Sequence, residues 1–418
     1  MDQYPDPAPG SYRRWVIFVI GSLNFVISMF YRASTAVISP TLIREMDMTS
    51  AQLSDLSAAF YYAFAAGQIP LGIALDRIGC RKAMCLLAFV AVGGVLVFAT
   101  GQTPDRLILG RAVLGLGMSG NLMVLFALIA VWFPMDRFAF LTGAVIAVGV
   151  FGNLLASSPL ALLSMHIGWR ESFLICAGIN AVVVLSFVLV IKDHPAGCPE
   201  QHQKPGSLVA GLGRLIRMYS FWAISLTSAV RYGYFAALQS LWLGPFLVLG
   251  MGMEEIAAGH VLFCMGVGYM LGLPLWGSVS DRLLRSRKRV VLPTMIAFAL
   301  ITLSFAYWTQ SVPPWMLFFT FFCLGFTASP GQILYAHIKE LLPASMVAQA
   351  ITSVNLFTIL GVGAMIHLLG LVLGDEATAL SGPEGFRSLW FLGAVAVGLV
   401  SLLYVAVPDS KLLRSDER

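Results

Sequence analysis

The sequence predicts an all-α, multi-pass membrane protein whose twelve transmembrane helices form two pseudo-symmetric six-helix bundles. The first reason is composition: 58% of the residues are hydrophobic and only 11% are charged, against about 25% charged residues in an ordinary soluble domain. The second reason is a series of twelve long apolar runs. The third is a set of motifs that recurs at about half the chain length of 418 residues.

Each apolar run is long enough to form a membrane-spanning helix, which needs about 20 residues to cross about 30 Å of hydrocarbon. The run that starts at Trp15 is also too long for the apolar core of a cleavable signal peptide. Glycine and proline are scattered through the runs, as is usual in membrane helices. The predicted spans cover residues 15–43, 52–72, 83–101, 106–132, 139–163, 171–192, 219–249, 257–280, 290–309, 314–337, 345–373 and 386–407.

Lysine and arginine set the expected orientation, because cytoplasmic loops of membrane proteins are enriched in them. With both termini in the cytoplasm, the outer loops hold only Arg44, Arg106, Arg170 and Arg387 of the 26 Lys and Arg residues. The net charge of +5 is then explained by topology and requires no nucleic-acid partner. We expect a monomer in the lipid bilayer of the plasma membrane, or of the inner membrane if the source is bacterial.

Three pairs of motifs relate the two halves of the chain. Asp76 in GIALDRIGCRK corresponds to Asp281 in GSVSDRLLRSRK, Pro134 corresponds to Pro343, and GWRESF corresponds to GFRSLW. A polar stretch with Pro and Gly separates the halves and is typical of a linker. We predict a first bundle at residues 1–192, a cytoplasmic linker at 193–217 and a second bundle at 218–418. Parallel repeats with a binding site near the middle of the membrane are typical of transporters.

The motif GIALDRIGCRK resembles the loop between spans two and three of the major facilitator superfamily, G-x-x-x-D-R-x-G-R-R, with Cys80 as one extra residue. This resemblance covers nearly the whole chain and implies a secondary transporter. It also implies that residues of this loop and its second-half copy gate the cytoplasmic side by docking on helix N-termini, whose dipoles attract carboxylates. The alternative is that these charges only fix topology. The predicted gating residues are Gly72, Asp76, Arg77, Gly79, Arg81, Asp281 and Arg282.

A polar stripe follows one face of the first span, where Asn24, Ser28, Arg32 and Thr35 are spaced by helical turns. Arg32 is near the middle of this run, where an isolated cation costs about 2.5 to 3.5 kcal/mol. The corresponding span of the second half carries Arg231 near its middle. Every acidic residue lies in a loop, in a tail or at a span end, so neither arginine has a deep protein counterion.

Two guanidinium groups without a protein anion predict a small anionic substrate that binds both, because the planar fork of arginine matches a carboxylate or a phosphate. The alternative is that the arginines cap backbone carbonyls or are hydrated in a cavity. On the first interpretation, removal of either guanidinium abolishes uptake and leaves the protein folded.

The stretches FYRASTAVISPTL and VRYGYFAALQSLWLGPFL resemble spans one and seven of the organophosphate:phosphate antiporters and of the anion:cation symporters, including the sialin-like carriers. The resemblance implies that Arg32 and Arg231 hold the substrate anion. The symporters often carry Asp where this chain has Tyr31, and the glycerol-3-phosphate carriers have a histidine in span five that is missing here. Without the Asp, the substrate itself must neutralise the arginines, which favours anion exchange over proton symport.

Other polar side chains in the spans are candidates for lining the site, although each is individually more often an interhelical hydrogen-bonding partner. His337 and His367 are candidates for proton coupling, with a packing role as the alternative, because histidine titrates near neutral pH. Arg111 is near the outer end of span four, so it either reaches the membrane interface or serves the site. The further predicted substrate-binding residues are Tyr31, Tyr62, Gln68, Asn121, Tyr234, Gln239 and Tyr335.

No pattern in the sequence predicts a nucleophile–base pair, an ATP-binding loop, a metal-binding cluster or a cofactor. Three alternatives to an anion exchanger remain: a proton-coupled carrier, an exporter of a neutral or cationic compound, and a transporter-like membrane receptor. The arginine pair argues against the exporter, and the short linker and tails argue against the receptor.

Overall fold

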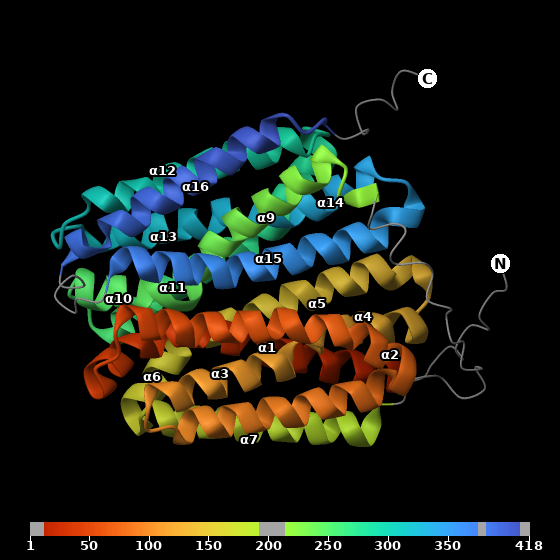
Figure 1. Ribbon diagram of the computed structural model, residues 1–418, viewed down its shortest axis with the longest axis horizontal. Coiled ribbons are helices and arrows are strands. Elements are labelled where there is room, and N and C mark those ends of the chain that lie inside the picture. Colours follow the sequence, from red (N-terminus) through yellow and green to blue (C-terminus); the bar gives the residue numbers. More distant parts are fainter. Residues whose placement is uncertain (1–11, 192–213, 375–381, 410–418) are drawn as a thin grey trace. The chain divides into compact units, whose positions relative to one another are not determined.

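The computed structural model describes residues 12–191, 214–374 and 382–409 (Figure 1). These ranges contain helices and their connections and no β-strand. The chain divides into two compact units: the first comprises Met1–Ser34 and Ala59–Lys204, and the second comprises Thr35–Ala58 and Pro205–Arg418. Most of the predicted linker, residues 193–213, lies outside the described residues.

The helices of the N-terminal half include several that break or bend within one predicted span (Figure 1). They are α1 (Tyr12–Met46), α2 (Ser50–Thr100), α3 (Pro104–Met118), α4 (Asn121–Trp132), α5 (Met135–Leu155), α6 (Ser158–Ile167) and α7 (Trp169–Val190).

The helices of the C-terminal half contain short π and 3₁₀ segments inside the predicted spans. They are α9 (Tyr219–Ala237), η1 (Leu238–Trp242), α10 (Leu243–Pro245), η2 (Phe246–Gly250), α11 (Glu255–Ser278), η3 (Val279–Leu283), α12 (Lys288–Ser304), η4 (Phe305–Tyr307), α13 (Pro314–Ala328), η5 (Ser329–Gln332), α14 (Ile333–Leu341), α15 (Ala344–Leu373), η7 (Pro383–Phe386) and α16 (Arg387–Val405).

Eleven helical stretches in the described ranges are long and apolar enough to cross a membrane, and each matches one of the predicted spans. The predicted span at 52–72 is the first part of α2, which continues into the next span through a turn at Gly79. Gly79 has φ 79° and ψ 167°, a conformation that side-chain-bearing residues rarely adopt. The predicted helical membrane fold is confirmed.

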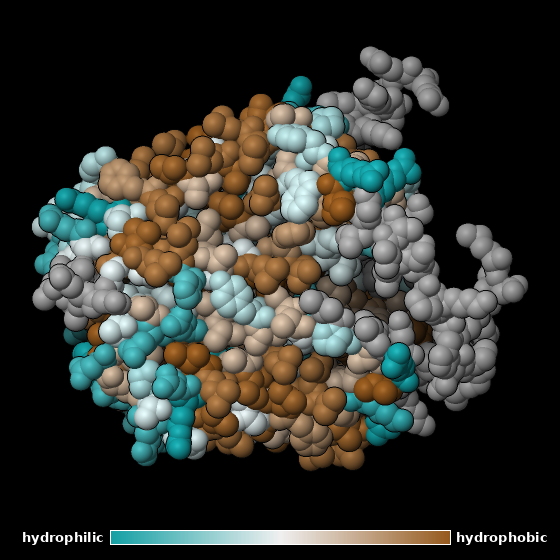
Figure 2. All heavy atoms as spheres, in the orientation of Figure 1, coloured by the Kyte–Doolittle hydropathy of each residue, from teal (hydrophilic) through white to brown (hydrophobic). Residues whose placement is uncertain are grey.

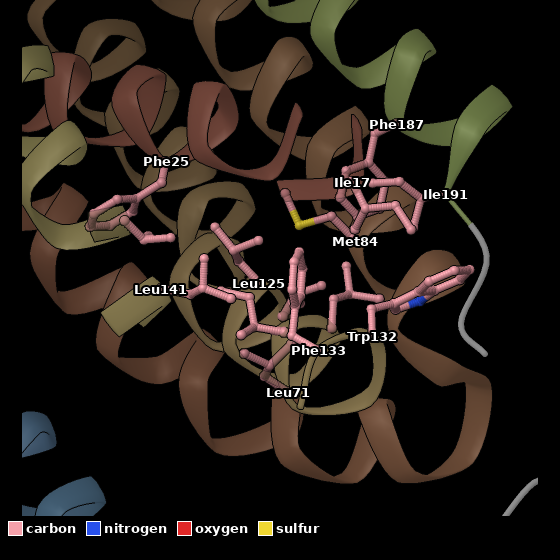
Figure 3. Packing of buried hydrophobic residues seen from close by; sticks show 14 residues of the cluster. Ile17, Phe25, Leu71, Met84, Leu125, Trp132, Phe133, Leu141, Phe187 and Ile191 are labelled. Carbon is pink, nitrogen blue, oxygen red and sulfur yellow. The ribbon is translucent and has the colours of Figure 1, made fainter. Parts of the chain in front are cut away.

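The core of the first unit is an apolar cluster contributed by α1, α2, α4, α5 and the end of α7 (Figure 3). Phe25, Leu125 and Leu141 are labelled members of this cluster, and each is at most 4% exposed. Such burial stabilises each side chain by about 1.5 to 3 kcal/mol in water, whereas in lipid the gain comes from close packing.

Helix pairing in the second unit joins α9 to α15 and α16, α11 to α13, and α12 to α16. Glycine permits two of these approaches: a Cβ atom on Gly233 of α9 would meet the backbone of Gly361 in α15, and one on Gly268 of α11 would meet the carbonyl of Phe322 in α13. Small residues at such contacts allow the dispersion attraction that holds membrane helices together. On the face shown in Figure 2, apolar side chains cover the helices and hydrophilic ones gather toward the helix ends.

The end of α1 and the start of α2 pack within the second unit. Arg44 forms an ion pair with Glu255, which also accepts a hydrogen bond of 3.3 Å from Thr41. Asp55 lies 3.3 Å from Nδ1 of His367. Residues 35–58 therefore make polar contacts with α11 and α15 of the C-terminal half.

Candidate functional site

Arg231 is almost fully buried in the middle of α9, at 1% exposure. Its Nη2 donates hydrogen bonds to the carbonyl oxygens of Thr327, at 3.0 Å, and Ala328, at 2.7 Å. Both acceptors lie at the end of α13, where the helix gives way to the 3₁₀ turn η5. The cation therefore sits against the negative end of a helix dipole.

A polar network lies on the helices around Arg231. Tyr335 of α14 donates to Thr358 of α15 at 3.2 Å, and Thr358 is 2.7 Å from Ser228 of α9. On α11, the side chain of Tyr269 lies near that of Gln332 in the break. Hydroxyl groups of α9, α14 and α15 thus form one network, which includes the predicted site residue Tyr335. Tyr269 lies close enough to Arg231 to interact with it electrostatically.

Tyr234 and Gln239, also predicted on the seventh span, are placed differently. Tyr234 is fully buried, its ring meets Phe298 of α12, and its hydroxyl is 3.4 Å from the carbonyl of Leu389 in α16. Its contacts are therefore on other helices than those of Arg231. Gln239 is half-buried in the π-helical segment η1, a type of distortion that is frequent at functional sites.

Arg32 of α1 is half-buried in the first unit. Its guanidinium carbon lies 4.3 Å from the centre of the Phe64 ring in α2, which is close enough for a cation–π interaction. Its Nε is buried and has no hydrogen-bond partner among the described residues. Tyr62 and Gln68, predicted on the same second span, are exposed and half-buried, respectively.

The position of Arg111 in α3 is incompatible with one of its two predicted roles, that of reaching the membrane interface. The side chain is fully buried and does not extend to the membrane interface. Its Nη1 donates to the carbonyl of Tyr31 at 2.8 Å, and its guanidinium lies 4.8 Å from the ring centre of Phe60. A long arginine side chain can extend to the membrane interface only if its guanidinium points toward the interface. The guanidinium of Arg111 instead lies against the rings of Phe60 and Phe98.

Tyr31 and Asn121 are both buried in the first unit. The Tyr31 hydroxyl has no partner among the described residues. Asn121 of α4 donates to the carbonyl of Asn24 at 3.2 Å and so ties span four to span one. This contact fits the interhelical alternative for Asn121.

The predicted gating residues of the first half surround the turn at Gly79. Arg81 donates to the carbonyl of Val188 at 2.6 and 3.1 Å, and Arg13 donates to that of Val190 at 2.8 and 3.2 Å. Two cations therefore cap the C-terminal end of α7. Arg77 is exposed. Gly72 and Asp76 are part of α2, but the structure does not describe their burial or the side chain of Asp76.

In the second half, the gating candidate Asp281 is paired within its own loop. It accepts from Arg287, whose Nη2 is also 2.7 Å from Glu340 at the end of α14. Burial acts to lower the pKa of Arg287, but hydrogen bonds to Glu340 and Asp281 raise the pKa above its ordinary value. Arg282 is exposed. The sequence did not single out Arg287 or Glu340, although Arg287 lies in a dense basic run.

The two histidine candidates differ in their contacts. His337 is buried, with Nδ1 2.6 Å from the hydroxyl of Tyr404 and Nε2 3.0 Å from the carbonyl of Pro408. Because the carbonyl can only accept, Nε2 carries the proton and Nδ1 accepts from the tyrosine. This is the arrangement of a packing histidine. His367, next to Asp55, is half-exposed.

In the part of the chain that the structure describes, no acidic side chain forms an ion pair with Arg32, Arg111 or Arg231. Nor does any group of three or more His, Cys, Asp or Glu residues there have the placement to hold a metal ion. The three intramembrane cations are therefore stabilised by backbone carbonyls and aromatic rings, and each of them keeps at least one buried nitrogen without a hydrogen-bond partner among the described residues.

The family model described as Major Facilitator Superfamily matches residues 20–258 and 235–418. The chain belongs to this family. It is accordingly a membrane transport protein and not an enzyme, as the loop motif and the internal repeat predicted.

Curated relatives of this superfamily protein include transporters of organic anions. A probable sulfoacetate transporter of Cupriavidus necator is 28% identical over 44% of this chain, and the match spans only 42% of that relative's own length. A probable galactarate/D-glucarate transporter of Bacillus subtilis is 22% identical over 96% of this chain and 93% of its own.

The superfamily fold is also found by comparison with solved structures. A bacterial homologue of the human lysosomal transporter Spinster has a TM-score of 0.76 to this protein, covering 95% of this chain and 97% of that chain at 17% identity. At this identity the likeness concerns the fold alone.

Proposed function

We propose that this protein is a secondary transporter of small organic carboxylates that works by alternating access, with Arg32 and Arg231 as the groups that bind the anion. The observation that carries the proposal is the half-buried guanidinium of Arg32, which lies over Phe64 with its Nε unpartnered and has no acidic partner among the described residues. An anion would supply the counterion, and its binding would offset part of the cost of a cation in the membrane.

Carboxylates are favoured over phosphate esters. The relatives named for galactarate, D-glucarate and sulfoacetate act on carboxylate-bearing anions, and the histidine of the glycerol-3-phosphate carriers is missing from span five. The polar network of Ser228, Thr358 and Tyr335, on α9 and two other helices of the same unit, offers hydroxyl groups, which suits a hydroxylated substrate. We take D-glucarate as the first probe.

We further propose that transport is an anion exchange. An empty carrier would hold unneutralised cations in its site, and moving them through an occluded, water-poor state is costly. A loaded carrier would move them as a neutralised pair. The substrate would therefore be needed for both directions of the cycle.

Purified protein in liposomes tests the proposal. We expect labelled D-glucarate to enter vesicles loaded with unlabelled D-glucarate at least tenfold faster than empty vesicles, and glycerol 3-phosphate to compete poorly. Rapid uptake into empty vesicles, driven by an inward proton gradient, would overturn the exchange mechanism. A lack of any D-glucarate binding or uptake would overturn the assigned substrate class.

Proton-coupled symport is the second candidate, and the contact between His367 and Asp55 favours it. Histidine is the side chain that titrates most readily near neutral pH, and Nδ1 of His367 lies 3.3 Å from Asp55. On this alternative, uptake into empty vesicles follows the proton gradient and is lost in His367→Gln.

A further inference from the structure

Span ten is broken at the sequence TASPGQ, and the structure accounts for each carbonyl that the break frees. Proline has no N–H and cannot continue an α-helix, so Pro330 leaves the carbonyl of Phe326 without its helical donor. Trp276 Nε1 and Ser329 Oγ replace that donor, at 3.0 and 2.9 Å. The carbonyl before it, Gly325, accepts from the backbone of Ser329.

The next two carbonyls, of Thr327 and Ala328, are the ones that accept from Nη2 of Arg231. Helix ends in membranes must find such substitutes because no bulk water is present. Next to them, a Cβ atom on Gly331 would collide with Nη1 of Arg231. The guanidinium of Arg231 therefore caps the carbonyls at the end of α13, and Gly331 leaves the space that it needs.

The chemistry of arginine makes this cap incompatible with full anion binding. A guanidinium binds a carboxylate with two parallel hydrogen bonds through either of two edges, Nε with Nη2 or Nη1 with Nη2. Both edges include Nη2. Nη2 already donates to two carbonyl oxygens, so a carboxylate that forms two bonds to Arg231 must compete with span ten for Nη2.

We propose that Arg231 is a coupling residue that passes between two partners, the carbonyls at the end of α13 and the substrate anion. Anion binding releases Thr327 or Ala328 and frees the η5 break to change shape, and loss of the anion restores the cap. The inference rests on the proposed function. It adds that Arg231 is the residue through which anion binding changes the conformation of span ten.

Hydrogen–deuterium exchange on the wild-type protein tests the coupling directly. With saturating D-glucarate, the peptide covering residues 326–334 is expected to exchange faster than without it, by at least about threefold, because its capped end is released. Unchanged or slower exchange in this peptide, in protein that binds D-glucarate, contradicts the coupling.

Pro330→Ala provides the matched variant. It restores a backbone donor and lets α13 continue, so the carbonyls no longer need Arg231. We expect D-glucarate to bind about tenfold more tightly, exchange transport to slow, and the anion-dependent change at 326–334 to disappear. Pro293→Ala removes a proline from α12 and leaves the sequence of the break intact, so it is expected to behave as wild type.

The outcomes separate this inference from the proposed function. If Arg231→Ala binds D-glucarate as well as wild type, or if wild type does not bind it, the proposed site is wrong. If Arg231→Ala loses binding while Pro330→Ala matches wild type in affinity, turnover and exchange, the site stands and the coupling is wrong.

Discussion

Arg32 and Arg231 occupy matching places on the first helix of each half, yet their surroundings differ. Arg231 is 1% exposed and its Nη2 is held by two backbone carbonyls. Arg32 is half-buried, lies over an aromatic ring and makes no hydrogen bond through its buried Nε. The repeat has preserved the position of the charge but not its surroundings: Nη2 of Arg231 is held by backbone carbonyls, whereas Arg32 lies on an aromatic ring, and the buried Nε of each has no hydrogen-bond partner among the described residues.

Replacement by alanine gives the largest expected effects. Arg32→Ala and Arg231→Ala should each reduce D-glucarate exchange by at least about a hundredfold, since a charge-assisted pair with the anion is lost. Only Arg231→Ala should also destabilise the protein, by about 1 to 3 kcal/mol, because it removes the side-chain donor from two buried carbonyls. The sequence alone predicted that both variants would fold normally, and the structure changes that expectation for Arg231.

Transport and thermal unfolding of both variants in detergent provide the measurements. Arg137→Ala, at an exposed position, is the control for loss of a charge. Equal stability of Arg32→Ala and Arg231→Ala would contradict the expectation that only Arg231 stabilises its unit through backbone carbonyls.

Replacement by lysine should sharpen the difference. Arg231→Lys keeps three donors for the carbonyls of span ten and should recover most of the stability lost in the alanine variant. Both lysine variants should still slow exchange by about tenfold, because an ammonium cannot form the two parallel hydrogen bonds of a guanidinium. We expect Arg231→Lys to recover stability without recovering transport. Full transport by either lysine variant would argue against bidentate binding of the anion by arginine.

Phe64→Leu tests the support beneath Arg32 and should have a smaller effect. A cation–π contact is worth about 0.5 to 2 kcal/mol, so the KM for D-glucarate should rise about threefold to tenfold while the protein remains folded. Phe151→Leu, at an exposed position of α5, is the control. If the two variants have the same KM, the ring does not position Arg32.

The smallest effects are expected at the contact between Asp55 and His367, which lies away from both arginines in sequence. Pairs this exposed contribute little, so Asp55→Asn and His367→Gln should change exchange at pH 7 by less than about threefold. Initial rates between pH 5.5 and 8.5 are the measurement. A loss of pH-driven uptake in His367→Gln would instead favour proton symport. Transport would then be coupled to protonation of this histidine and not to neutralisation of the two arginines by the substrate.

Much of the fold could be predicted from the sequence because a membrane limits the possibilities. Apolar runs of sufficient length gave the spans, and the turn that joins two of them at Gly79 follows from a glycine in a charged loop. The breaks inside spans were less visible. Ser329, Pro330 and Gly331 form a recognisable helix-breaking triplet, but hydropathy averages over such a triplet and treats span ten as one helix.

The site was predicted in part. Charge alone indicated Arg32 and Arg231, since any cation inside a membrane requires an explanation. Which neighbours face them depends on helix rotation, and a spacing of three residues placed Tyr234 with Arg231 although its contacts are with α12 and α16. Tyr269 and Phe64 escaped notice because a single Tyr or Phe in an apolar run carries no distinctive pattern.

The packing of residues 35–58 against the C-terminal half has a consequence for biosynthesis. Arg44 precedes its partner Glu255 by 211 residues, and ribosomes add about 5 to 20 residues per second. The end of the first helix must therefore wait roughly 10 to 40 seconds in the membrane before its partner is made. During that interval Arg44 and Asp55 have no C-terminal surface to meet, so the nascent chain depends on lipid headgroups, water or the insertion machinery to shelter them. The packing of residues 35–58 is consequently completed only after α11 and α15 have been synthesised.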